Sequence, residues 1–229
     1  SFSIEATHKD ISEFMAEFPF EATVAQKKAI EAILGDMRSG HPMSRLLEGD
    51  VGSGKTAVAA VAAYAAVHTR PPAQNFGTLQ VAYMAPTEIL AKQHFESFIK
   101  FFERFPINIG LITGSGCYKF PSKVSGGVTN ISRAQLLKWV ANGEIPVLIG
   151  THALIEKSVQ FKHLALVVID EQHRFGTNQR RKLAKKDKQL PHLLSMTATP
   201  IPRTLALTIY GDLDLTLLDE MPPGRKKII

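Results

Sequence analysis

The chain has 229 residues, of which 45% are hydrophobic and 21% are charged, and its net charge is +6. This length and balance predict a globular protein with a substantial core, in one large domain or two small ones. A single cysteine, Cys117, excludes an intrachain disulfide and cannot make a zinc site by itself. No apolar run approaches the roughly 18 to 20 residues of a membrane span, and SFSIEATHKD lacks a signal-peptide pattern. We therefore expect a cytoplasmic protein.

The predicted elements alternate between strands and helices after a helical start. Two helices, at residues 7–17 and 24–39, come first, and the second ends near Gly40. Several of the later apolar runs do not alternate with polar residues, which is typical of strands buried on both faces of a parallel sheet. The predicted strands are residues 44–49, 78–85, 107–113, 145–150, 164–170 and 193–198. The predicted helices between and after them are residues 55–69, 87–104, 131–142, 178–187 and 202–209.

This order predicts one doubly wound α/β domain over residues 1–219, with a helical lead-in over about 1–43. Two stretches break the alternation. Residues 114–130, GSGCYKFPSKVSGGVTN, are rich in glycine, serine, lysine and proline and predict a long surface loop around Cys117. Residues 220–229 contain a Pro-Pro-Gly stop followed by basic residues, and they predict the start of a linker to another domain.

The positive charge is concentrated in residues 174–188, which hold seven basic side chains and one acid, Asp187. This segment alone accounts for the surplus of the whole chain. A local basic surplus is typical of a surface that binds a polyanion, although a solvated helix face gives the same pattern. Charge alone leaves both interpretations open.

Residues 49–56, GDVGSGKT, match the phosphate-binding pattern G-x-x-x-x-G-K-[ST] between a predicted strand and a predicted helix. The glycines permit positive φ angles that let backbone N–H groups converge on an anion, and the helix adds its positive dipole end. An ordinary strand-to-helix connection would not need the Lys-Thr pair. We expect Lys55 to reach the β- and γ-phosphates and Thr56 to bind Mg²⁺. The predicted nucleotide-binding residues are Gly49, Asp50, Val51, Gly52, Ser53, Gly54, Lys55 and Thr56.

The strand LALVVID ends directly in two acids, Asp170 and Glu171. The carboxyl ends of parallel strands share the sheet edge where ligands bind, so Asp170 would face the same nucleotide as Lys55 and hold Mg²⁺. Glu171 would orient or deprotonate the attacking water. The alternative is that both acids cap a turn. The predicted catalytic residues are therefore Lys55, Asp170 and Glu171.

Asp170 begins the tetrapeptide DEQH, a DExH box, and with GDVGSGKT it resembles the superfamily 2 helicases and translocases. Further segments resemble motifs of that superfamily: APTEILAKQH, ITGS, GTHALI, MTATPIPRT and FPFEATVAQ, which ends at Gln26. The combination of GDVGSGKT, DEQHRFG, MTATPIPRTLALTIYGDLDL and PPGR is most similar to the RecG family of bacterial DNA helicases. The Mfd family of transcription-repair coupling translocases is the alternative, and a P-loop NTPase of another class, without nucleic acid, is a second one.

The resemblance implies a RecA-like lobe that binds ATP and Mg²⁺, with Gln26 reading adenine. It also implies contacts to the backbone of branched double-stranded DNA, such as replication forks and Holliday junctions, in recombination and repair. The DNA-contacting residues that it implies are Thr87, Thr113, Gly114, Thr151, His152 and Arg174, and those that it implies couple hydrolysis to DNA are His173, Thr197 and Thr199. Thr87 can equally be a helix N-cap, and His152 a structural histidine.

The same resemblance implies that a second RecA-like lobe and an N-terminal wedge domain belong to the same longer polypeptide. The second lobe would supply an arginine finger, so we expect the 229 residues alone to be nearly inactive. A bacterial cytoplasmic location at the nucleoid also follows from the family.

Overall fold

The computed structural model describes residues 1–50, 52, 54–170, 190–198 and 214–218. Within these ranges the strands are β1 (Ser44–Gly49), β2 (Gln80–Met84), β3 (Ile109–Thr113), β4 (Gly116–Phe120), β5 (Thr129–Ile131), β6 (Val147–Gly150), β7 (Leu164–Asp170), β8 (His192–Thr197) and β9 (Asp214–Leu218). The helices are α1 (His8–Ala16), α2 (Val24–Arg38), α3 (Lys55–Val67), α4 (Glu88–Phe102) and α5 (Arg133–Ala141), with a short 3-10 turn, η1 (His152–Ile155).

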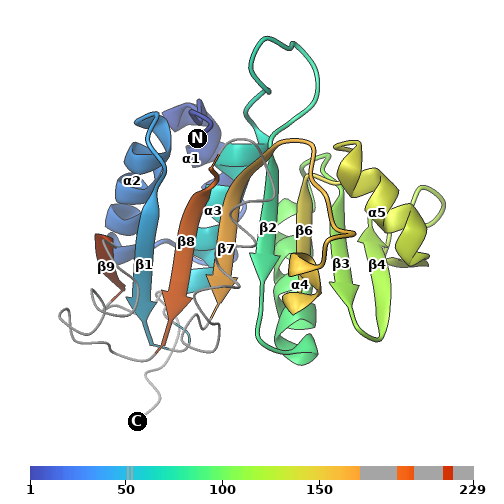
Figure 1. Cartoon of the computed structure of the whole chain (residues 1–229). Helices are drawn as coiled ribbons and strands as arrows, with labels where there is room; N and C mark the ends of the chain where they lie inside the picture. The colour runs from blue at the N-terminus through green and yellow to red at the C-terminus, as the bar shows by residue number, and fades with distance from the viewer. Residues whose placement is uncertain (51, 53, 171–189, 199–213, 219–229) are drawn as a thin grey trace.

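One sheet joins all the described strands, in the order β5-β4-β3-β6-β2-β7-β8-β1-β9 (Figure 1). From β3 to β9 each neighbouring pair is parallel, and β4 and β5 are added antiparallel at one edge. Every residue of β2, β6 and β7 is buried, as expected for parallel strands that are covered on both faces. The predicted parallel α/β sheet is thereby confirmed.

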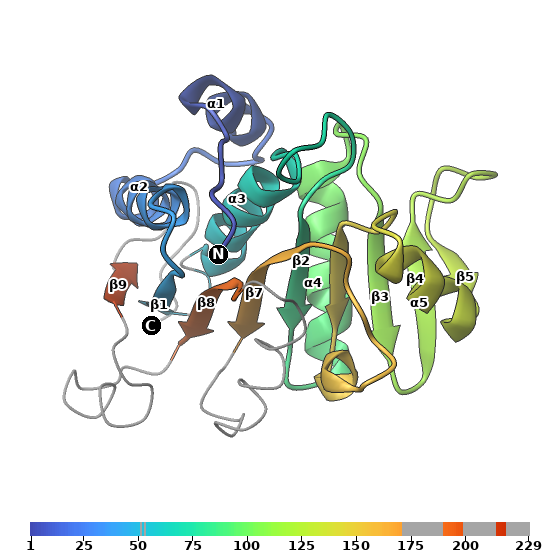
Figure 2. The same cartoon turned by 45° about the horizontal axis from the view of Figure 1, so that its top comes forward.

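Helices cover both faces of the sheet (Figure 2). The helices α1 to α4 share one buried apolar cluster with one face, whereas α5 and η1 pack with side chains of the other face. The alanine-rich helix α3 is buried from Ala57 to Val67, because it lies between the sheet and its neighbours α1, α2 and α4. None of the helices in the described ranges is long and apolar enough to cross a membrane.

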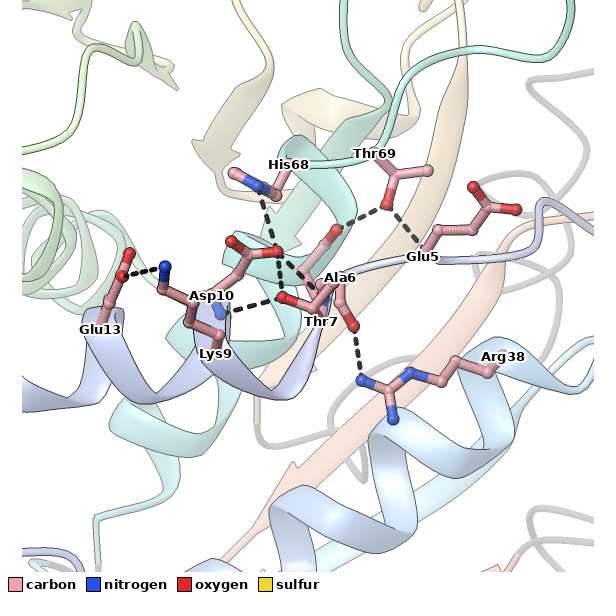
Figure 3. A network of polar contacts seen from close by, with 10 residues as sticks. Glu5, Ala6, Thr7, Lys9, Asp10, Glu13, Arg38, His68 and Thr69 are labelled. Carbon is pink, nitrogen blue, oxygen red and sulfur yellow. Dashed lines mark hydrogen bonds and ion pairs between the residues drawn. The ribbon is translucent and has the colours of Figure 1, made fainter.

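Polar contacts organise the helical lead-in and join it to the end of α3 (Figure 3). The Glu5 N–H donates to the Thr69 hydroxyl at 3.1 Å, just beyond the end of α3. The Arg38 guanidinium of α2 donates to the Ala6 carbonyl at 2.5 Å. Thr7 and Asp10 form a capping box that starts α1. The first two helices therefore pack on α3 as part of the same core.

The prediction of a surface loop over residues 114–130 is wrong for residues 116–120 and 129–130. Residues 116–120 form β4, which pairs with β3, and residues 129–131 form β5, which pairs with β4. Cys117 is 7% exposed and packs toward α5, whereas Tyr118 and Phe120 pack on the cluster around α4. This alternation is the period of a strand, and the glycines, serines and prolines around it obscured the pattern. A loop remains only at the tip, where Val124 is exposed.

Strand β9, at residues 214–218, was not predicted, and it adds a further parallel partner to β1. The other predicted strands and helices of the described ranges are confirmed, with ends shifted by a few residues. The described residues do not include the predicted helices at 178–187 and 202–209, the basic segment 174–188 or the predicted linker 220–229.

Candidate nucleotide and DNA site

The segment 49–56 connects the end of β1 to the first residues of α3, as the phosphate-binding pattern requires. Gly52 and Gly54 have φ angles of 85° and 87°, the left-handed region that a glycine enters without steric cost. Gly54 is the N-cap of α3 and, lacking a side chain, makes no side-chain cap. The first turn of α3 therefore begins without a capping side chain at the point where a phosphate would bind. Val51 and Ser53 lie outside the described residues.

Lys55 is the first residue of α3, and its side chain lies along its own loop. Its ammonium group donates to the carbonyl oxygens of Gly49, at 2.5 Å, and Asp50, at 3.2 Å. These contacts keep the cation at the mouth of the loop. A mobile ammonium on a four-carbon stem can exchange carbonyl oxygens for phosphate oxygens without moving the backbone.

Asp170 ends β7 and is 7% exposed. Its carboxylate lines a cavity of about 330 Å³ together with Gly52, Gly54, Lys55 and Thr56. The structure thus brings together the predicted phosphate-binding loop and the predicted metal-binding pair, Thr56 and Asp170. A hydroxyl and a carboxylate beside a phosphate site are oxygen ligands of the kind that Mg²⁺ prefers, so these residues fit the predicted metal. Glu171 lies outside the described residues.

A larger cavity, of about 910 Å³, lies between α1 and α2. Its lining includes Ile11, Met15 and Leu34 and none of the residues of segment 49–56. Volume alone would favour this cavity, but it lacks the glycine loop and the carboxylate. The chemistry of its lining therefore makes the smaller cavity the candidate nucleotide site, despite its smaller volume.

Gln26 has a structural role that the sequence analysis did not foresee. Its side-chain oxygen accepts the Thr23 N–H at 2.9 Å, and the Thr23 hydroxyl accepts the Gln26 N–H at 3.0 Å. The two residues form a buried capping box at the start of α2, where Gln26 is 1% exposed. Phe20, six residues earlier, lines the nucleotide cavity. Adenine recognition by Gln26 stays a prediction.

The predicted DNA contacts follow the ends of β2, β3 and β6, at the same sheet edge as Gly49 and Asp170 (Figure 1). Thr87 is the N-cap of α4, and its hydroxyl accepts the Leu90 N–H at 3.2 Å. The first turn of α4 also touches the β3–β4 turn, because the Glu88 carboxylate accepts the Ser115 N–H and hydroxyl, both at 3.0 Å. Two of the predicted DNA segments are therefore joined by hydrogen bonds.

Three other predicted contacts differ in how they are exposed. Thr113 is 2% exposed and its hydroxyl donates to the Gly116 carbonyl at 3.0 Å, which shapes the turn around Gly114. Thr151 is 6% exposed, whereas His152, which opens η1, is exposed. Of these side chains, that of His152 is available to a partner at this edge. Arg174 lies outside the described residues.

Of the predicted coupling residues, the structure describes Thr197, which ends β8. Thr197 is fully buried and lies beside Glu48 of β1 in the sheet register. This position is next to the phosphate-binding loop. His173 and Thr199 lie outside the described residues.

The sequence analysis missed His94 as a site residue. Its Nε2 donates to Asp170 Oδ2 at 2.6 Å, and its Nδ1 is hydrogen-bonded to the Tyr83 hydroxyl at 3.2 Å. Burial raises the pKa of Tyr83 well above its usual value, and the negative charge of Asp170 raises that pKa further. A hydrogen bond with Thr56 lowers the pKa in part, but the phenol stays protonated. The signal was available, because His94 lies between Ala91 and Phe98 at helical spacing, on a face that is otherwise apolar.

Comparison with known proteins identifies the family of this chain. A family model described as DEAD/DEAH box helicase matches residues 23–208. The ATP-dependent DNA helicase RecG of Bacillus subtilis is 47% identical over 222 residues, which are 97% of this chain and 30% of that protein. The RecG of Aquifex aeolicus is 47% identical over 227 residues, which are 99% of this chain and 26% of that protein. The chain thus spans less than a third of the length of these relatives.

Solved structures give the same result for the fold. A structure of RecG bound to a three-way DNA junction matches with a TM-score of 0.76 and 40% identity, over 99% of this chain and 27% of that one. A DEAD box protein from Methanococcus jannaschii matches with a TM-score of 0.64 at 19% identity, over 94% of this chain and 55% of that one, which supports the fold alone. These findings confirm the RecA-like fold and favour RecG over the Mfd alternative. The chain belongs to the DEAD/DEAH box helicase family and, within it, is similar to the bacterial RecG helicases.

Proposed function

We propose that this chain is the first motor lobe of an ATP-dependent, RecG-like DNA helicase that remodels branched DNA. One observation carries the proposal: a single cavity collects Lys55, Thr56 and Asp170, at the sheet edge that also bears the predicted DNA contacts. The likeness to RecG, including a structure bound to a three-way DNA junction, supports branched DNA as the substrate. The relatives are bacterial, so we further propose that the protein acts in the cytoplasm, at the nucleoid.

In the proposed reaction each residue of the cavity has one task. Lys55 binds the β- and γ-phosphates, and the N–H groups of the glycine loop bind phosphate oxygens. Thr56 and Asp170 would hold Mg²⁺, whose positive charge would stabilise the negative charge on the phosphate oxygens in the transition state. Glu171 orients or deprotonates the attacking water, and Gln26 reads adenine. Binding by the lobe is thus separable from hydrolysis.

Hydrolysis requires parts beyond these residues. We propose that residues 1–219 form one lobe, that residues 220–229 begin a linker, and that a second RecA-like lobe and a wedge domain complete the full-length protein. The chain spans 30% of the Bacillus subtilis relative, which leaves room for these parts. An arginine finger from a partner domain is worth about 10³ to 10⁵ in rate, so the lobe alone should turn over ATP very slowly.

The DNA contacts proposed for this lobe position the backbone of the duplex and do not read its sequence. Thr87 at the N-terminus of α4, the turn around Thr113 and Gly114, and Thr151 with His152 offer hydroxyls, an imidazole and backbone N–H groups. Arg174 adds a positive charge. We propose that His173, Thr197 and Thr199 transmit the state of the nucleotide to this edge.

The test is an ATPase assay on the full-length protein with no DNA, with linear duplex and with a four-way junction. The proposal expects strong stimulation by the junction, and no stimulation by any DNA would overturn it. Lys55→Ala should abolish ATP binding. Glu171→Gln should keep binding and stop hydrolysis, and normal turnover in that variant would refute the role given to Glu171.

A further inference from the structure

A buried chain of polar side chains lies behind the nucleotide cavity. His94 of α4 is 8% exposed, Asp170 of β7 is 7% exposed and Tyr83 of β2 is fully buried. The 2.6 Å contact joins His94 to Asp170, and the 3.2 Å contact joins it to Tyr83, whose ring centroid lies 4.6 Å from that of His94. Both ring nitrogens of His94 are therefore engaged, which fixes the orientation of the imidazole.

The two ends of this chain are the two predicted metal-binding residues. Asp170 is at one end, and Tyr83 is hydrogen-bonded to Thr56 at the other. Asp170, Thr56 and His94 all line the nucleotide cavity. A hydroxyl that offers a lone pair to a cation still has its O–H to donate, so the Thr56 hydroxyl can serve the metal and Tyr83 together.

The helix that carries His94 also carries a predicted DNA contact. Thr87 caps α4, and His94 follows seven residues later, roughly 10 Å along the helix axis and on the same side of it. Leu90 lies between them in sequence; its N–H donates to the Thr87 hydroxyl, and the residue lines the candidate nucleotide cavity. The C-terminal ends of the parallel strands, where the predicted DNA contacts lie, are here called the DNA edge. Helix α4 therefore has its first turn at the DNA edge and its second turn against the carboxylate of Asp170.

We propose that His94 is a positioning residue, which orients the Asp170 carboxylate for the metal of the bound nucleotide and links that carboxylate, through α4, to the DNA edge at Thr87. This proposal rests on the proposed function for its DNA part. One carboxylate oxygen, Oδ2, is held by His94, which restricts rotation of the Asp170 carboxylate. Removing such a partner of a metal-binding group typically costs about 10- to 100-fold in metal affinity or activity.

The first experiment measures binding in the full-length protein and does not depend on turnover. A fluorescent ADP analogue is titrated with and without Mg²⁺ against the wild type and His94→Ala. The expected result is that His94→Ala weakens the Mg²⁺-dependent part of the affinity about 10- to 100-fold and leaves the metal-free affinity unchanged. Equal Mg²⁺ dependence in the two proteins would overturn the positioning role.

Two further variants separate positioning from a general loss of stability. His94→Gln keeps an N–H donor near the place of the imidazole Nε2, so it should restore most of the Mg²⁺-dependent affinity. Phe95→Leu is the matched control at the next position of α4. Phe95 is 4% exposed, so this change removes apolar volume from the core but leaves the hydrogen bond between His94 and Asp170 in place. Loss of Mg²⁺-dependent affinity in Phe95→Leu equal to that in His94→Ala would also refute the role.

The link to DNA is tested by turnover of the same variants with and without a four-way junction. His94→Ala should lower kcat with little change in KM for the junction, and it should reduce the ratio of stimulated to unstimulated turnover. An unchanged ratio would overturn the link through α4. Failure of the proposed function looks different, because the wild type itself would then show no stimulation while the Mg²⁺ result still stood.

Discussion

Gly150, in the predicted DNA segment GTHALI, should be intolerant of even one added methyl group. A Cβ at Gly150 would lie 2.5 Å from the Ile112 carbonyl oxygen and 2.7 Å from Ile112 Cγ2. The nearest atom belongs to the backbone of β3, so the strain is relieved only if β3 and β6, which pair at these residues, move apart. Overpacking of this kind costs about 1 to 3 kcal/mol of unfolding free energy.

A matched substitution elsewhere should have the opposite sign. Gly35 is exposed within α2, and a Cβ there meets nothing within 4 Å. Gly35→Ala should therefore raise the unfolding free energy by about 0.5 to 1 kcal/mol, because alanine is the better helix former. Urea denaturation followed by circular dichroism compares the two variants with the wild type. A midpoint for Gly150→Ala equal to or above that of the wild type would refute the close-approach argument.

Three further predictions concern buried polar groups. Burial lowers the pKa of His192, whose Nε2 donates to the Phe2 carbonyl at 2.7 Å. As pH falls below about 6.5, histidine in the unfolded chain is protonated before His192 in the folded chain. The unfolding free energy should therefore fall with pH until the lowered pKa of the folded state is reached. Urea midpoints at pH 7.5 and 5.5 should differ less in His192→Gln. Burial also raises the pKa of the Cys117 thiol, so a thiol reagent should modify it slowly until urea unfolds the chain, and rapid native labelling would contradict this. Gln26→Ala should cost about 1 kcal/mol of unfolding free energy without any nucleotide, through the lost cap of Thr23, and an unchanged urea midpoint would argue against that role.

Residue patterns with a short, strict spacing were sufficient to predict which residues come together around the candidate nucleotide cavity. The segment 49–56 and the acid that follows an apolar strand each require one local geometry, and a parallel sheet places both at one edge. The structure describes Lys55, Thr56 and Asp170 around one cavity, as these patterns predict. Local chemistry and sheet topology agree here, so the sequence could predict this grouping of residues.

The same reasoning failed where the outcome depends on long-range packing. The composition of residues 114–130 indicates a loop, but the edge of β3 offers unpaired backbone groups, and β4 satisfies them by pairing antiparallel. His94 was missed for a related reason. Its role depends on Asp170, 76 residues later in the chain, and no spacing rule connects the two.

The position of Asp170 explains why some partner such as His94 is needed at all. A carboxylate at the end of a fully buried strand has lost most of its hydration, and a buried charge without a hydrogen-bond donor is strongly unfavourable. A cation would neutralise such a group only while it is bound, whereas helix α4 supplies a hydrogen-bond donor without any ligand. The donor could belong to any neighbouring element, but here it is His94 of α4, about two turns from the cap at Thr87. The group that stabilises the buried carboxylate therefore lies on the helix that Thr87, a predicted DNA contact, caps, and any displacement of that helix must change the surroundings of Asp170.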